Sequence, residues 1–95
     1  MANPKIKKEF AISHDGLFPR SFWNKIQKRY GLTDREVQVL HVLCHGKGNA
    51  EIADTLFIDV ETVRSHLKNI FTKTRQHKRA ALMARVVHLW AGVEE

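Results

Sequence analysis

Apolar residues recur every three or four positions in five successive segments of the chain, a spacing that predicts amphipathic helices. In the first segment, residues 17–30, the side chains of Phe22, Ile26 and Tyr30 lie four residues apart, and Gly31 offers a stop. The pattern therefore predicts an all-α fold. The other four helices are expected at residues 33–45, 49–56, 60–73 and 79–90.

The fourth segment has two contrasting faces. On a helix, Val63 and Leu67 fall on one side, whereas Arg64, Ser65 and Lys68 lie on the other. A solvated charged face is also the commonest feature of ordinary surface helices. However, a short helix and a three-residue turn come directly before this segment, and the three together form a helix-turn-helix arrangement. We therefore predict that helix 60–73 lies in the major groove of double-stranded DNA.

Two helix starts carry capping signals. Thr33 and Glu36 have the spacing of a capping box, in which each side chain accepts a hydrogen bond from the other residue's backbone N–H. Asp59 precedes the fourth helix and supplies an acceptor for its free N–H groups. These residues predict where the second and fourth helices begin.

The last helix is apolar on two sides. In a domain of this size, we expect that one protomer cannot cover both sides, so that part of this helix pairs with a twofold mate or with the first helix. The residues expected at the dimer surface are Leu82, Val86, Leu89 and Trp90.

Positive charge is concentrated in two parts of the 95-residue chain, whose formal net charge is +6. Residues 1–30 contain seven Lys or Arg against two acidic residues, and residues 61–79 contain six against one. This distribution favours an anionic partner at the fourth helix and at the N-terminal segment. We divide the chain into a basic arm with an accessory helix, residues 1–30, and a helix-turn-helix domain, residues 31–95.

These segments together resemble the LuxR-type DNA-binding domain, also called NarL- or GerE-type, over about residues 31–90. The resemblance implies a four-helix domain that binds DNA mostly as a dimer at inverted repeats and uses its final helix for pairing. It is carried by Leu32-Thr33-x-Arg35-Glu36, Leu40, Gly46, Glu51-Ile52-Ala53-x-x-Leu56, Thr62-Val63-x-x-His66-x-x-Asn69-Ile70 and Lys73.

The same resemblance implies residue roles. By position, Arg64, Ser65 and Lys68 correspond to side chains that reach base edges. Thr62, Lys73 and Arg79 correspond to phosphate contacts.

The chain departs from the family pattern at three positions. Thr74 stands where the family usually has Leu, Asp59 where it often has Ser, and Lys78 where it often has Asn. The first departure is expected to cost some burial, and none removes a contacting residue. Members commonly carry an N-terminal receiver or ligand-sensing domain. Residues 1–30 are too short to be either, so the resemblance implies no signal-sensing function.

Other chemistry is weakly supported by the sequence. His41, Cys44 and His45 form the only metal-like cluster, but Cys44 belongs to an apolar stripe, and we interpret the two histidines as surface residues. We therefore expect no metal and no cofactor. No phosphate loop, paired carboxylates or nucleophile elbow is present, so we expect no enzymatic activity.

The main alternative is a protein-interaction module that binds another regulator through its last helix and leaves the basic face idle. RNA binding is a third option, but the chain lacks the exposed aromatic pairs usual for single strands. The single cysteine and the lack of a membrane-spanning or secretion segment predict a cytoplasmic protein with no membrane partner.

Overall fold

The computed structural model describes residues 18–92, so the expected basic arm lies outside the described residues. The all-α prediction is confirmed, because this part of the chain forms helices and no strand. Its helices are α2 (Arg20–Tyr30), α3 (Asp34–Leu43), α4 (Asn49–Leu56), α5 (Val60–Thr74) and α6 (Arg79–Trp90).

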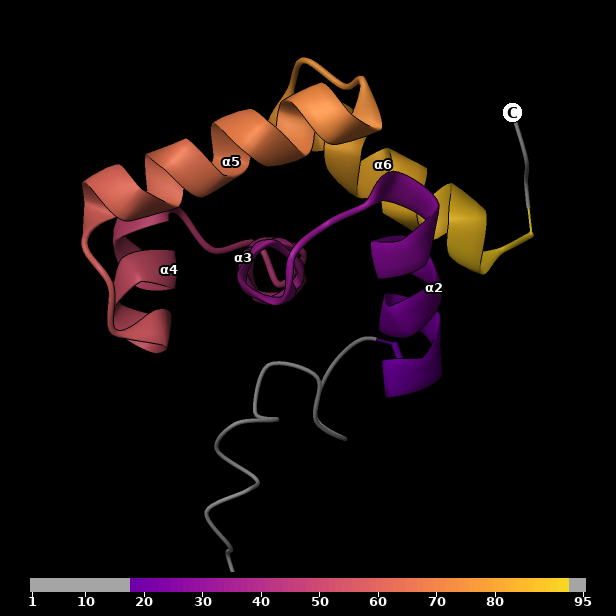
Figure 1. The fold of residues 1–95 in the computed structure, drawn as a ribbon, viewed down its shortest axis with the longest axis horizontal. Coiled ribbons are helices and arrows are strands. Elements are labelled where there is room, and N and C mark those ends of the chain that lie inside the picture. The colour runs from indigo at the N-terminus through magenta and orange to yellow at the C-terminus, as the bar shows by residue number, and fades with distance from the viewer. Residues whose placement is uncertain (1–17, 93–95) are drawn as a thin grey trace, which may run out of the picture.

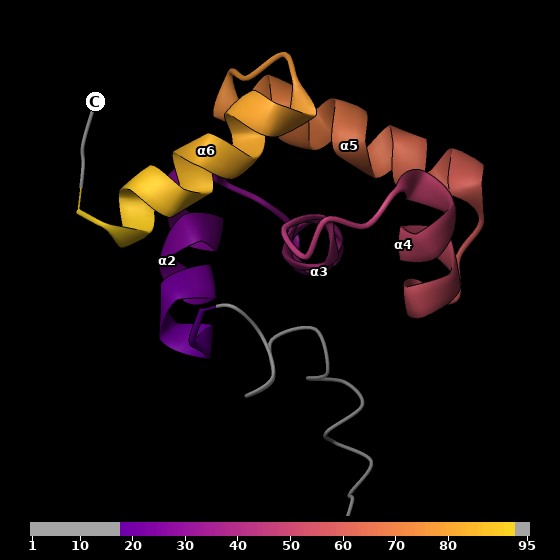
Figure 2. The same cartoon turned by 180° about the vertical axis from the view of Figure 1, so that it is seen from behind.

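The helices are arranged around α3, which is seen end-on in Figure 1. The long helix α5 crosses over α3, with α4 packed beside the N-terminal end of α5. The helices α6 and α2 lie together on the opposite side of α3, and the reverse view in Figure 2 shows the same arrangement. Because both its flanks and one face are covered, α3 is the centre of the core, and α5 keeps an uncovered outer face.

One hydrophobic core joins all five helices. The accessory helix α2 contributes Phe22, Trp23 and Ile26 to this core, and Trp23 is fully buried. The first helix therefore packs against the rest of the domain. The other fully buried large side chains are Ile26, Val37, Val39, Leu40, Leu43, Ile52, Val63, Ile70, Leu82 and Val86.

The predicted caps are present. The Thr33 hydroxyl accepts a hydrogen bond from the Glu36 N–H (3.1 Å), and Glu36 Oε1 accepts one from the Thr33 N–H (2.9 Å). Asp59 Oδ1 accepts a hydrogen bond from the Thr62 N–H (2.8 Å). Since each bond satisfies a backbone donor with no partner inside its helix, these side chains fix the starts of α3 and α5.

Two helix boundaries differ from the sequence prediction. α2 begins at Arg20, with Pro19 as its N-cap, rather than at Leu17, which lies outside the described residues. α3 ends at Leu43, earlier than expected, and a turn follows in which Gly46 has a φ of 84°. Only glycine adopts this left-handed conformation without strain, so Gly46 serves the turn after α3 rather than the last turn of the helix.

The departure at Thr74 is accommodated inside the core. Thr74 is buried, and its hydroxyl donates a hydrogen bond to the Ile70 carbonyl (2.8 Å). The expected loss of apolar burial is thus accompanied by a satisfied polar group rather than by an orphaned one.

Candidate nucleic-acid interface

The outer face of α5 carries the residues predicted to contact bases. Arg64, Ser65 and Lys68 are all exposed, whereas Val63 and Leu67 on the inner face are buried in the core. Residues three or four positions apart on a helix share one side, and Lys68 lies four positions after Arg64 and three after Ser65, so the three polar side chains project together away from the protein. The structure brings these three predicted residues onto a single accessible surface.

Arg64 forms an ion pair with Glu61 within this face. Both side chains are largely exposed, and exposed ion pairs of this kind contribute little to stability. The pair therefore holds the guanidinium near the outer surface but binds it only weakly. A guanine edge or a phosphate can replace the Glu61 carboxylate at a small cost in free energy.

Thr62 lies at the first turn of α5, where its N–H is already bonded to Asp59. This hydrogen bond from the Thr62 backbone is the main cause that lowers the pKa of Asp59 below its usual value. The carboxylate of Asp59 is therefore charged at neutral pH and occupies the end of α5. The Thr62 hydroxyl also hydrogen-bonds to Asp59 and lowers the pKa of that carboxyl further, so a phosphate at this position would compete with Asp59 for the hydroxyl.

Lys73 is placed differently from the expectation of a free phosphate contact. Its Nζ donates a hydrogen bond to Oε1 of Glu36 (2.8 Å), and that carboxylate is only 3% exposed. Burial by itself raises the pKa of Glu36, but the hydrogen bonds from Lys73 and the Thr33 backbone outweigh burial and lower it. Lys73 thus neutralises a buried charge and ties the end of α5 to the start of α3.

Arg79 connects the start of α6 to the start of α4. Its guanidinium donates one hydrogen bond to Oδ1 of Asn49 (2.7 Å) and one to the carbonyl of Lys47 (2.9 Å). These bonds hold the guanidinium beside the outer face of α5, where Arg79, Arg64 and Lys68 line one hollow of about 530 Å³.

Asn49 and His77 are among the residues that line this hollow and that the sequence did not single out as site residues. Asn49 is the first residue of α4, and His77 lies in the connection between α5 and α6. The signal that could have identified His77 is its place in a connection flanked by basic residues at the end of α5.

The residues expected at a dimer surface divide into two pairs. Leu82 and Val86 are buried within the single chain, so they are not available to a second copy. The expectation was that one protomer cannot cover all four residues, and α6 places only Leu82 and Val86 fully inside the common core. Leu89 is half-buried and Trp90 is 52% exposed, so only this pair can contribute to a dimer contact.

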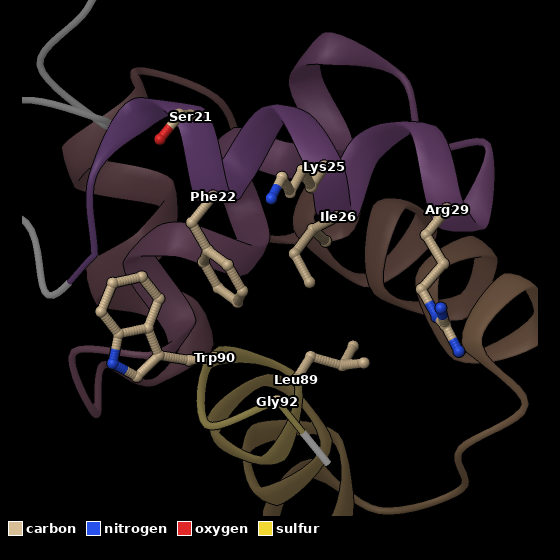
Figure 3. A pocket seen from close by; sticks show the side chains of 8 residues that line it. All are labelled: Ser21, Phe22, Lys25, Ile26, Arg29, Leu89, Trp90 and Gly92. Atoms are coloured by element: carbon tan, nitrogen blue, oxygen red, sulfur yellow. The ribbon is translucent and has the colours of Figure 1, made fainter. Parts of the chain in front are cut away.

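A groove of about 460 Å³ lies between α2 and the end of α6 (Figure 3). Phe22 and Ile26 point into it from α2, and Leu89 and Trp90 face them from α6. The ring centroids of Phe22 and Trp90 are 5.3 Å apart in an edge-to-face arrangement. The accessory helix therefore covers part of the α6 surface that was expected to pair.

One residue of the metal-like cluster, His41, differs from the prediction, whereas His45 is exposed as expected. His41 is buried rather than at the surface, with its ring 4.9 Å from the His45 ring, and burial lowers its pKa to about 4. Burial raises the pKa of the Cys44 thiol to about 12, which disfavours the thiolate that metals bind. Among residues 18–92, no group of three or more His, Cys, Asp or Glu side chains could hold a metal ion.

This geometry agrees with a comparison of the chain with known families. The family model described as bacterial regulatory proteins, luxR family, matches residues 30–86. The chain belongs to the luxR family. The match covers α3 to α5 and most of α6 and leaves out nearly all of α2, so the accessory helix is an addition to the luxR-family domain.

The relatives of this luxR-family chain include regulators from several bacteria. It is 46% identical over 50 residues to the nitrate/nitrite response regulator protein homolog of Haemophilus influenzae, covering 53% of this chain and 24% of the relative. It is 40% identical over 60 residues to the transcriptional regulatory protein LiaR of Bacillus subtilis, covering 61% and 28%. For the nitrate/nitrite response regulator protein NarP of Escherichia coli the identity is 42% over 50 residues, covering 53% and 23%.

The chain spans about a quarter of the length of these curated relatives. No solved structure matches it. Its likeness is to a family of regulatory proteins rather than of enzymes. None of the helices described here has the length and apolar character needed to cross a membrane.

Proposed function

We propose that this protein is a DNA-binding transcriptional regulator that recognises a specific double-stranded sequence with α5 in the major groove. The observation that carries the proposal is the shared outer face of Arg64, Ser65 and Lys68 on a helix whose inner face is fixed in the core. Arg suits the paired acceptors of guanine, Lys supplies a flexible donor, and Ser can bond to several base edges. The partner is double-stranded DNA, which in a bacterial cell places the protein in the cytoplasm.

The phosphate contacts in this proposal come from Thr62, Lys73 and Arg79. Arg79 is the best supported, because its bonds to α4 hold the guanidinium beside the outer face of α5. Lys73 forms an ion pair with the buried Glu36, so its attraction for a phosphate is weaker than that of an unpaired lysine. Phosphate contacts of this kind orient the helix in the groove but carry no sequence information.

We further propose that the protein binds DNA as a homodimer on an inverted repeat, with Leu89 and Trp90 at the contact. The support is the exposed part of Trp90 beside the exposed Val87 on the outer side of α6. Two recognition helices would then enter successive major grooves about 34 Å apart. Sedimentation of the protein with a palindromic duplex tests this arrangement, and strictly monomeric binding to one half-site would exclude it.

A second candidate function is an adaptor that binds another regulator. It is favoured by one observation, the groove between α2 and α6 with its partly exposed Trp90. In this alternative the outer face of α5 would contribute only nonspecific charge. The two functions differ in whether Arg64 and Lys68 determine the preference for one duplex over another.

The deciding experiment begins with selection of a preferred site from random duplexes. Arg64→Ala or Lys68→Ala should then cost about 1–3 kcal/mol on that site and much less on a scrambled duplex, because only the charge term is common to both. Lys28→Ala is the matched control, since Lys28 is an exposed cation on α2, remote in sequence from the recognition helix. Circular dichroism checks the fold. A specificity ratio that stays at the wild-type value in both variants favours the adaptor.

A further inference from the structure

Two hollows meet at His77, at the C-terminal end of the recognition helix. One, of about 530 Å³, runs along α5 beside Arg64 and Lys68, and the other, of about 430 Å³, lies beside Arg75 and Gln76. The residues common to both hollows are Phe71, Thr72 and His77. His77 therefore stands between two recesses on the face that carries the predicted base contacts.

The groups that face His77 from each neighbouring helix are cationic or neutral. α5 contributes Arg64 and Lys68 and ends in its C-cap Arg75, and α6 contributes Arg79. The only side chain from α4 is the neutral amide of Asn49. No described acidic residue lines either hollow, in contrast to Lys73, which faces the buried Glu36.

We propose that His77 binds a phosphate of the DNA backbone in its protonated form, with Arg79 and the Thr72 hydroxyl on either side. Thr72 is exposed, and its hydroxyl donates to the Lys68 carbonyl (3.0 Å), so its single proton rotates away from that carbonyl when it donates to a phosphate at the rim. This inference rests on the proposed function, because the anion it names belongs to the duplex. It adds a contact that follows from neither the recognition face nor the family pattern.

The consequence is a proton taken up when DNA binds. The phosphate would be the first negative charge beside His77, and a nearby opposite charge favours the imidazolium over the neutral ring. An ordinary imidazole titrates near pH 6.5, so this preference acts within the range where the fold can be studied. If the phosphate favours protonation by about one pH unit, affinity for DNA rises roughly fivefold between pH 7.5 and pH 5.5.

The test uses the full chain and a fluorescent 20-base-pair duplex of scrambled sequence, a probe that reports phosphate contacts and not base recognition. Anisotropy titrations at pH 7.5, 6.5 and 5.5 should show this roughly fivefold gain in affinity for wild type and little gain for His77→Gln. His77→Lys should bind at pH 7.5 about as tightly as wild type at pH 5.5 and show little further change. The wild-type salt slope at pH 5.5 should exceed that of His77→Gln by roughly one unit.

His88→Gln is the control for a histidine outside the hollows, since His88 is exposed near the end of α6. The His88→Gln variant should show the same rise in DNA affinity between pH 7.5 and pH 5.5 as wild type. An unchanged gain in His77→Gln would overturn the inference, as would a His77→Lys protein that binds like His77→Gln. Failure of the proposed function is distinguishable, because it shows as an unchanged specificity ratio in Arg64→Ala and Lys68→Ala whatever the pH dependence on scrambled DNA.

Discussion

The helix-turn-helix side of the molecule, α3 to α5, and the side formed by α2 and α6 are specified in different ways. On the first side, helix starts are fixed by local side chains: Thr33 caps α3, Glu51 bonds to the Gly48 N–H before α4, and Asp59 caps α5. On the second side, α2 and α6 begin without a side-chain capping bond. Their positions depend instead on packing between residues distant in sequence.

Aromatic rings provide much of that packing. Trp23 lies edge-to-face against His41 with centroids 5.3 Å apart, and Phe18 and Phe22 lie near Trp90 with centroids 5.2 and 5.3 Å away. The Trp23 Nε1 atom and both ring nitrogens of His41 are buried without a hydrogen-bond partner in the structure. The contact of α2 with α3 thus buries polar ring atoms without hydrogen bonds, whereas the backbone donors at the starts of α3 and α5 are satisfied by neighbouring side chains.

The largest effect should come from removing the ring that joins the two sides. Trp23→Ala deletes a fully buried indole between α2 and α3 and should lower the free energy of unfolding by about 3–5 kcal/mol. Trp90→Ala is the matched variant, because that ring is half exposed, and it should cost much less. Urea melts measure both. Equal losses would mean that α2 is held mainly through α6 rather than through α3.

A second, smaller effect should appear as pH falls. His41 has a folded pKa of about 4, below the ordinary value near 6.5, so it is neutral when folded and gains a proton more readily when unfolded. Its contribution is therefore complete above pH 6.5 and is lost as pH falls toward 4, roughly 2 kcal/mol of it by pH 5. Urea melts of wild type and His41→Leu at pH 7.5 and pH 5 test this. A variant that loses as much stability as wild type would exclude His41 as the cause.

The same contrast explains how far the sequence could predict the fold. The caps at Thr33 and Asp59 and the inner stripe of α5 follow from the spacing of a few neighbouring residues, and the structure confirms them. The burial of His41, Leu82 and Val86 could not be predicted, because it depends on where α2 and α6 settle against α3. The spacing of apolar residues identifies the buried side chains of a helix only when other helices cover a single, known face of it.

The candidate site shows the same division. The outward projection of Arg64, Ser65 and Lys68 follows from helical geometry alone. The neighbours of Lys73 and His77 do not, because Glu36 lies 37 residues from Lys73 in sequence, and the hollows at His77 are lined by residues of three helices and of the connection before α6. Base contacts were therefore easier to predict than the roles of the surrounding cations.

A third prediction asks which of two roles Lys73 has. Lys73→Met keeps the alkyl stem but leaves the buried carboxylate of Glu36 without its cation, and it should cost roughly 1–2 kcal/mol, reduced from a fully buried pair because Lys73 is partly exposed. Lys73→Arg should recover most of this. Urea melts are read beside salt titrations on a duplex. A salt slope lowered by one unit with unchanged stability would assign Lys73 to a phosphate instead.

The smallest effect tests the local signals themselves. Thr33→Ala removes the hydroxyl that accepts from the Glu36 N–H and should lower the free energy of unfolding by about 1 kcal/mol. Thr55→Ala is the matched control, since the Thr55 hydroxyl only donates back to the Glu51 carbonyl within α4, and its removal should be nearly neutral. Thr33→Ser should restore the cap. If Thr33→Ala and Thr55→Ala melt alike, the start of α3 is held by core packing, and the helix-turn-helix side depends on distant contacts as much as the α2–α6 side does.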